Sequence, residues 1–187
     1  MALARWKDLC IDANRPATVA PFWGSVLGLT VGEGGGTDLT LRGTVPEEGI
    51  WFNTVPEPKT VKNRVHLDLV QAYGPLVEAG ARLLADHEVD GRIWAVLADQ
   101  EGNELCAFAP DPGRDWGSAL VVDAHDAPAI AGWWAEVLGA ELHPGPDGVL
   151  RWLRGVPGLP YDVWKFVPVP EPKTVKNRWH WDVMCDD

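Results

Sequence analysis

The sequence predicts an α+β fold of tandem βαβββ modules, with three full modules and the first strand of a fourth. The strongest observation is an exact repeat, because the string VPEPKTVKNR occurs at Val55–Arg64 and again at Val169–Arg178. Each copy, here called a strap, leads into a similar segment, VHLD after the first and WHWD after the second. A weaker repeat relates Leu9–Leu29 to Leu120–Ala140, 111 positions later. Repeats of this kind are typical of a duplicated supersecondary unit.

Each copy of the weaker repeat predicts a strand followed by an amphipathic helix. Apolar residues recur in both copies at the spacing of one buried helical face. They are Val19, Phe22, Trp23, Val26 and Leu27 in the first copy, and Ile130, Trp133, Trp134, Val137 and Leu138 in the second. Gly28 and Gly139 stand where a left-handed C-cap would end each helix. Short strands are expected afterwards, at Asp38–Arg42, Ile50–Asn53, Gly148–Leu153 and Tyr161–Val167.

The segment between these copies predicts another unit with the same order of elements. Its apolar runs indicate strands at Val65–Val70, Arg82–Ala85, Trp94–Ala98 and Glu104–Phe108. A short helix is expected at Pro75–Ala79, where Gly80 follows as a stop signal. The predicted order is therefore βαβββ here too.

These units divide the chain into two predicted domains. Modules are expected at 5–55, 62–109 and 116–169, and the fourth has only its first strand, at 177–187. Residues 1–110 would form a complete domain and residues 111–187 an incomplete one. The turn-forming segment Pro110–Trp116 is interpreted as the linker between them. Since an unfinished sheet leaves an exposed edge, we expect a homodimer through the incomplete C-terminal half.

Composition excludes several function classes. The formal charge of −11 argues against binding to nucleic acid or to an anionic membrane, because both require basic surface. The 3 cysteines are scattered, which predicts neither a disulfide framework nor a zinc finger. No signal peptide or long apolar segment is evident, so a cytoplasmic location is expected. The 11 tryptophans exceed what an ordinary core needs and favour a pocket with aromatic walls.

Three motifs carry a resemblance to a known family: FWGSVLGL after a strand, VPEPKTVKNR before HLDL, and LADQEGNELCAF as a closing hairpin. Together they resemble the vicinal oxygen chelate (VOC) superfamily, in particular its glyoxalase-like proteins of the glyoxalase, bleomycin resistance and dioxygenase type. This resemblance implies curved mixed sheets around a cleft, each made by two βαβββ modules. We expect the cleft to lie between modules one and two.

The resemblance also implies where a metal would bind. Metal-using members of the superfamily take ligands from the first and last strands of their modules, and these positions correspond here to Asp8, His66 and Cys106. Glu104 lies two residues before Cys106 and so shares its strand face. The tentative metal set is therefore Asp8, His66 and Glu104, for one divalent Zn, Ni, Fe or Mn ion. The alternative is a protein without a cofactor.

Polar residues alternate with apolar ones in the strand that follows the first strap. Arg64, His66 and Asp68 therefore share one face, where the carboxylate could orient the imidazole for acid–base work. A solvated or internally paired strand face would give the same pattern. The candidate ligand-binding residues are Arg64, His66, Asp68, Glu104, Cys106 and Trp51. The strap cations either join modules structurally or bind an anion.

Four functions remain open at this stage, one of them a structural half-protein that works only after it pairs with itself or with another subunit. The leading interpretation is a protein that binds a small organic metabolite in the cleft. The first alternative is a metal-dependent lyase, isomerase or dioxygenase. The second is a non-catalytic protein that sequesters a drug or metabolite, as in bleomycin resistance, with tryptophans stacked on the ligand.

Overall fold

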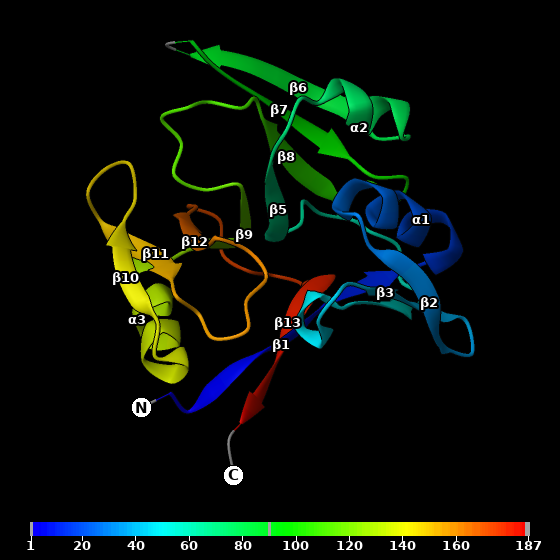
Figure 1. Cartoon of the computed structure of the whole chain (residues 1–187), viewed down its shortest axis with the longest axis horizontal. Helices are drawn as coiled ribbons and strands as arrows, with labels where there is room; N and C mark the ends of the chain where they lie inside the picture. The colour runs from blue at the N-terminus through cyan, green and yellow to red at the C-terminus, as the bar shows by residue number, and fades with distance from the viewer. Residues whose placement is uncertain (1, 90, 186–187) are drawn as a thin grey trace.

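The computed structural model describes residues 2–89 and 91–185, which form two curved sheets and three α-helices (Figure 1). The outer limits predicted for the two domains, residues 1 and 187, lie outside the described residues, as do the last two residues of the predicted fourth-module strand. In the described part of the chain, none of the helices is both long and apolar enough to cross a membrane.

The order βαβββ is confirmed for all three full modules. Module one contains β1 (Ala4–Ala13), α1 (Pro16–Leu27), β2 (Thr30–Gly35), β3 (Asp38–Arg42), a 3-10 turn η1 (Pro46–Glu48) and β4 (Ile50–Thr54). Module two contains β5 (Val65–Val70), α2 (Gly74–Glu78), β6 (Arg82–Val89), β7 (Arg92–Ala98) and β8 (Glu104–Phe108). Module three contains β9 (Ser118–Ala124), α3 (Ala127–Leu138), β10 (Glu141–Pro144), β11 (Leu150–Arg154) and β12 (Val163–Pro168). After the second strap comes β13 (Trp179–Cys185).

The pairing of modules differs from the expectation. Modules two and three share one sheet of order β10-β11-β12-β9-β5-β8-β7-β6, joined where β5 runs antiparallel to β9. Module one instead pairs with the lone fourth-module strand, in the order β13-β1-β4-β3-β2. The prediction of a cleft between modules one and two is therefore wrong, since these modules do not share a sheet. Alternation of apolar residues shows which strand face is buried, but it does not show which edge strands pair.

Helix α1 buries the face that its sequence predicts. Val19, Phe22 and Trp23 have 0–4% of their surface exposed. The indole Nε1 of Trp23 donates a 3.0 Å hydrogen bond to Asp99 Oδ2, at the β7–β8 turn of module two. This bond ties the helix of module one to the other sheet.

Helix α3 buries a narrower face than its counterpart α1. Ile130 and Trp133 are 42% and 56% exposed, so the prediction that they lie in the core is wrong. The buried positions are Ala127, Ala131, Ala135 and Leu138. Small alanines allow a helix to lie close to the sheet beneath it, and the larger side chains of Ile130 and Trp133 beside them stay partly exposed.

Helices α1 and α3 both end at the predicted glycine, but their N-termini are capped in different ways. Gly28 and Gly139 close α1 and α3 in the left-handed conformation, with φ of 69° and 64°, as predicted. At the N-terminus, α3 is capped by its own Asp126, which accepts a bond from the Ala129 amide. The first turn of α1 has no such side chain. Instead the Glu101 carboxylate, from module two, accepts bonds from the preceding main-chain amides of Asn14 and Arg15.

Candidate functional site

Titratable side chains gather on the face of the eight-stranded sheet opposite the packed core. Strand β5 buries Leu67 and Leu69 on the core side, so His66 and Asp68 point to the other face. Cys106 of β8 lies opposite Asp68 in the register. The potential ligand atoms of His66, Asp68 and Cys106 lie within 4.8 Å of one another.

Lys165 of β12 completes this group, which we call the Lys165 cluster: Lys165, Asp68, His66 and Cys106. Its Nζ lies 2.9 Å from Asp68 Oδ2, and the two side chains are only 5% and 8% exposed. The ammonium also lies 3.1, 5.2 and 5.6 Å from the ring centroids of Trp116, Trp152 and Phe108. These distances are typical of cation–π contacts. A buried cation is thus held by one carboxylate and three half-buried aromatic rings.

The environment of the cluster shifts three pKa values. Burial alone would raise the pKa of Asp68, but the contact with His66 (Nε2 to Oδ1, 3.5 Å) and the charge of Lys165 outweigh it, so the pKa is lowered. Burial lowers the pKa of Lys165, against the opposing effect of Asp68. Burial, together with the nearby Asp68 charge, raises the pKa of the Cys106 thiol to about 12. At neutral pH the Cys106 thiol is therefore protonated, beside the contact between Asp68 and Lys165.

This chemistry does not suit a divalent metal. Asp68 is already neutralised by the ammonium of Lys165, and a thiol must lose its proton before it binds a metal. The imidazole of His66 would be left as the one ready ligand. The Lys165 ammonium also lies against the Asp68 carboxylate, and its positive charge would repel a metal cation there.

A related group lies on the five-stranded sheet. Cys10 of β1 is opposite His180 of β13 in the register, and Asp8 is opposite Asp182. Ligand atoms of Cys10, His180 and Asp182 lie within 4.8 Å of one another, and we call these three residues together with Asp8 the Cys10 cluster. The ammonium of Lys7 bridges its carboxylates, at 2.9 Å from Asp8 and 3.3 Å from Asp182. Unlike Lys165, the Lys7 side chain is 43% exposed.

The tentative metal set is not brought together. Asp8 lies in the five-stranded sheet and His66 in the eight-stranded one. Glu104 turns to the first strap, where it pairs with Lys59 at 2.8 Å and accepts a bond from the Asn63 amide. Asp8, His66 and Glu104 therefore do not converge on one point where they could hold a single ion.

Two other candidate ligand-binding residues also lie apart from the Lys165 cluster. Trp51 is in β4 of the five-stranded sheet, where it lines a hollow of about 640 Å³ beside Lys7 and Asp8. Arg64 lines a cavity between the straps. Of the six candidates, the structure brings His66, Asp68 and Cys106 together.

Sequence reasoning missed Lys165, Trp116 and Cys10. Lys165 is the one charged residue in an apolar strand, and this exception to the pattern is a signal that could have drawn attention. Trp116 lies in the segment interpreted as a linker, and it covers the cluster together with Arg114, whose Cζ is 4.5 Å from its ring centroid. Cys10 carries no motif, and only its register with His180 makes it relevant.

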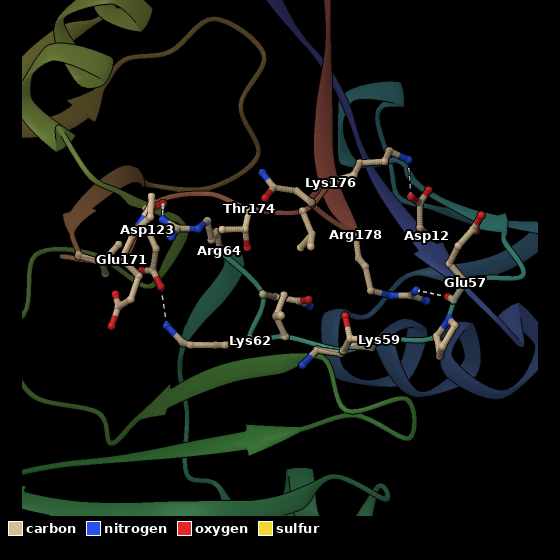
Figure 2. Close-up of a pocket in the computed structure, with 18 of the residues that line it drawn as sticks. Asp12, Glu57, Lys59, Lys62, Arg64, Asp123, Glu171, Thr174, Lys176 and Arg178 are labelled. Atoms are coloured by element: carbon tan, nitrogen blue, oxygen red, sulfur yellow. Dashed lines mark hydrogen bonds and ion pairs between the residues drawn. The ribbon is translucent and has the colours of Figure 1, made fainter.

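A cavity of about 1060 Å³ lies elsewhere, between the two straps (Figure 2). The two straps are joined across this cavity by hydrogen bonds. Arg64 donates to the main-chain oxygen of Glu171, and Arg178 donates to that of Glu57 at 2.7 Å. The Lys165 cluster combines a buried ion pair with a shell of aromatic rings, so it is the stronger candidate for the main site.

Comparisons with solved structures agree on the fold. Glyoxalase I from Zea mays has a TM-score of 0.58 at 12% identity, with 87% of this chain and 66% of that chain covered. A Bacillus subtilis protein provisionally named as a dioxygenase has a TM-score of 0.61 at 14% identity, with 92% and 66% covered. This chain thus spans about 66% of the length of these structures. No curated protein matches the sequence.

The family assignment rests on the sequence profile. The profile described as a glyoxalase-like domain matches residues 8–108 and again 119–187, which together make up most of the chain. Each match includes one strap, and each of the two clusters of titratable groups has residues in both matches. The chain belongs to the glyoxalase-like domain family of the VOC superfamily.

Proposed function

We propose that the chain binds a small, planar organic molecule with an oxyanion at the Lys165 cluster, without a metal ion. The observation that carries this proposal is the buried Lys165 ammonium, 2.9 Å from Asp68 and surrounded by Trp116, Trp152 and Phe108. An ammonium has three N–H donors, and Asp68 takes one of them. The others are suited to a ligand oxygen, while the half-buried rings offer surfaces for stacking.

The same site differs from a metal centre in the source of its positive charge. A metal would polarise a ligand oxygen as a Lewis acid. Here the Lys165 ammonium, held 2.9 Å from Asp68, would supply the positive charge instead. His66 adds an imidazole whose Nδ1 is buried without a hydrogen-bond partner in the described structure. That nitrogen is available to a ligand donor or acceptor.

Tryptophan fluorescence tests this proposal. A panel of aromatic hydroxy acids and 2-oxo acids, such as salicylate and phenylpyruvate, is titrated with EDTA present. We expect at least one to quench fluorescence with a Kd of about 1 mM or tighter, and Lys165→Met to weaken it about tenfold or more. Lys7→Met, a matched lysine change on the other sheet, is the control. A flat response across the panel, or equal binding by Lys165→Met, rules out the proposal.

A second candidate function, metal-dependent chemistry, is favoured by the Cys10 cluster. It offers an imidazole and two carboxylates, which suit Zn or a related divalent ion, and a thiol that would have to lose its proton on binding, since burial raises the pKa of Cys10 to about 12. Its blocking cation, Lys7, is half-exposed and flexible enough to turn away. Asp8, Cys10, His180 and Asp182 would hold the ion, which would supply Lewis-acid polarisation when bound.

Elemental analysis distinguishes the two clusters. After loading with Zn, Ni, Fe or Mn and desalting, we expect any stoichiometric metal to be lost in His180→Ala and kept in His66→Ala. Retention in His180→Ala would contradict the assignment to the Cys10 cluster. Absence of metal under every loading condition would remove the second candidate and leave the first untouched.

A further inference from the structure

The hollow beside Trp51, here called the Trp51 hollow, has features of a binding site that neither cluster explains. It lies where β1, β3 and β4 meet the turn η1, and its volume of about 640 Å³ is in the ordinary range for small-molecule pockets. Three large apolar side chains that are exposed line it: Val45, Trp51 and Met184, with 48%, 37% and 42% of their surface exposed. Exposed apolar side chains gathered around one concave surface are typical of a ligand site.

A buried hydroxyl without a partner lies beside the exposed indole. Thr40 of β3 is opposite Trp51 of β4 in the register, so their side chains share one face of the sheet. Thr40 is only 3% exposed, and its Oγ1 has no hydrogen-bond partner among the described residues. A buried hydroxyl is costly without a hydrogen bond, so it indicates a position that a ligand oxygen can stabilise.

The guanidinium of Arg42 is next to this hydroxyl. Gly32 of β2 lies opposite Thr40, and a Cβ added there would be 3.0 Å from Thr40 Oγ1 and 3.1 Å from Arg42 Nε. Since both atoms surround the same point, the hydroxyl and the guanidinium are close neighbours. Glycine at position 32 keeps open the space that they share. A guanidinium and a hydroxyl in this arrangement can donate together to one carboxylate.

Arg42 is the cation of the hollow that has no carboxylate partner. It donates to the main-chain oxygen of Glu33 at 3.4 Å, and no carboxylate oxygen of the described residues lies within 4.0 Å of its side-chain nitrogens. Lys7 has a second carboxylate partner in Asp182, which does not line the hollow. The other charged residues of the lining are paired with each other: Arg5 with Glu47 at 3.3 Å, and Lys7 with Asp8 at 2.9 Å.

We propose that the Trp51 hollow is a second binding site, for a planar aromatic carboxylate. Arg42 and Thr40 bind the carboxylate, and the aromatic ring lies against the indole of Trp51. This site is separate from the Lys165 cluster, because it belongs to the five-stranded sheet and Lys165 to the eight-stranded one. It also needs no metal ion at the Cys10 cluster.

Isothermal titration calorimetry with EDTA present tests this inference, with benzoate and 2-naphthoate as probes and the neutral amide of each for comparison. At least one acid is expected to bind with a Kd of about 1 mM or tighter, and its amide about tenfold more weakly. Arg42→Gln and Trp51→Leu should each weaken binding of that acid about tenfold or more. Arg82→Gln and Trp133→Leu are the matched controls, because both residues are exposed and neither lines the hollow.

Thr40→Val separates a binding role of the hydroxyl from a structural one. It replaces an unpartnered buried hydroxyl by a methyl group of similar shape, so the free energy of unfolding should stay the same or rise. Binding of the acid should nevertheless weaken about threefold or more, because one donor to the carboxylate is lost. If Arg42→Gln fails to fold, this variant decides: weaker binding supports the site and unchanged binding contradicts it.

Three further results would overturn the inference. The first is no binding by either acid, and the second is an amide that binds as tightly as its acid. The third is weakening of the acid by Lys165→Met but not by Arg42→Gln, which would assign the ligand to the Lys165 cluster. Weakening by Arg42→Gln with binding kept in Lys165→Met supports the second site, whatever the outcome at the first.

Discussion

Arg64 of the first strap donates a hydrogen bond to the main-chain oxygen of Glu171 in the second strap. Arg178 of the second strap donates the corresponding bond to Glu57 of the first. Each strap therefore provides the donor at its tenth position and the acceptor at its third. The reciprocal contact gives the exact repeat a structural role, since both copies must satisfy the same geometry.

Removing one side of this contact should lower stability. We expect Arg178→Gln to reduce the free energy of unfolding by about 1.5–3 kcal/mol, the usual range for a hydrogen bond from a charged group. Arg64→Gln should have a smaller effect, because Arg64 has no carboxylate partner comparable to Glu101. Urea unfolding provides the measurement, with Lys173→Gln as the control. The reverse order of the two arginine variants would contradict the structure.

The buried pair of Lys165 and Asp68 predicts strong coupling. Asp68→Asn leaves a buried ammonium without its counter-charge and should destabilise the fold by about 3–5 kcal/mol. Adding Lys165→Met removes that unpaired charge, so the double variant should be more stable than Asp68→Asn alone. A double-mutant cycle by urea unfolding measures this coupling. Additive losses would show that the two side chains do not interact as described.

The lowered pKa of Asp68 gives the direction of a pH effect. Its folded pKa lies below the unfolded value, so its stabilising contribution is complete above the unfolded pKa of about 3.9 and is lost as pH falls through the folded value. The stability difference between the wild type and Asp68→Asn should therefore shrink on acidification below about pH 4. Urea unfolding at a series of pH values tests this. A difference that grows in acid would contradict the lowered pKa.

The modular order was predictable because each unit has local signals: apolar runs, glycine stops and repeat spacing. The partner of each sheet edge was not, because β5 carries the same alternating pattern whether β9 or another strand lies beside it. His66 and Asp68 could be placed on one face from their spacing alone. Lys165 could not be brought to them, because its contact with Asp68 spans 97 positions and depends on that edge pairing.

Substitutions at equivalent positions of α1 and α3 should reduce the free energy of unfolding by different amounts. Phe22 and Trp133 correspond in the repeat, yet Phe22 is 4% exposed and Trp133 is 56% exposed. Phe22→Ala should cost about 3–5 kcal/mol as a cavity-forming core change. Trp133→Ala should cost well under about 2 kcal/mol, because much of the side chain already contacts solvent. Thermal or urea unfolding of both variants tests this, and equal losses would show that α3 buries the face that its sequence suggests.

The cysteines should differ widely in reactivity. Burial raises the pKa values of Cys10 and Cys106 to about 12, whereas Cys185 is exposed. A thiol with such a pKa is ionised in only about 1 molecule in 10⁴ at pH 8, and the thiolate is the reactive form. Iodoacetamide at pH 8 should therefore label Cys185 first, and label Cys10 and Cys106 only slowly until urea unfolds the chain.

Peptide mass spectrometry over a time course measures the three rates, and the urea-unfolded chain serves as the control in which they should converge. Rapid labelling of Cys106 in the folded protein would mean that its thiolate is stabilised, against the effect of the Asp68 charge. It would also reopen metal binding at the Lys165 cluster, because a thiolate beside His66 is a ready ligand. Slow labelling of Cys106 would agree with a protonated thiol, which is a poor metal ligand, and so with a site whose positive charge comes from Lys165.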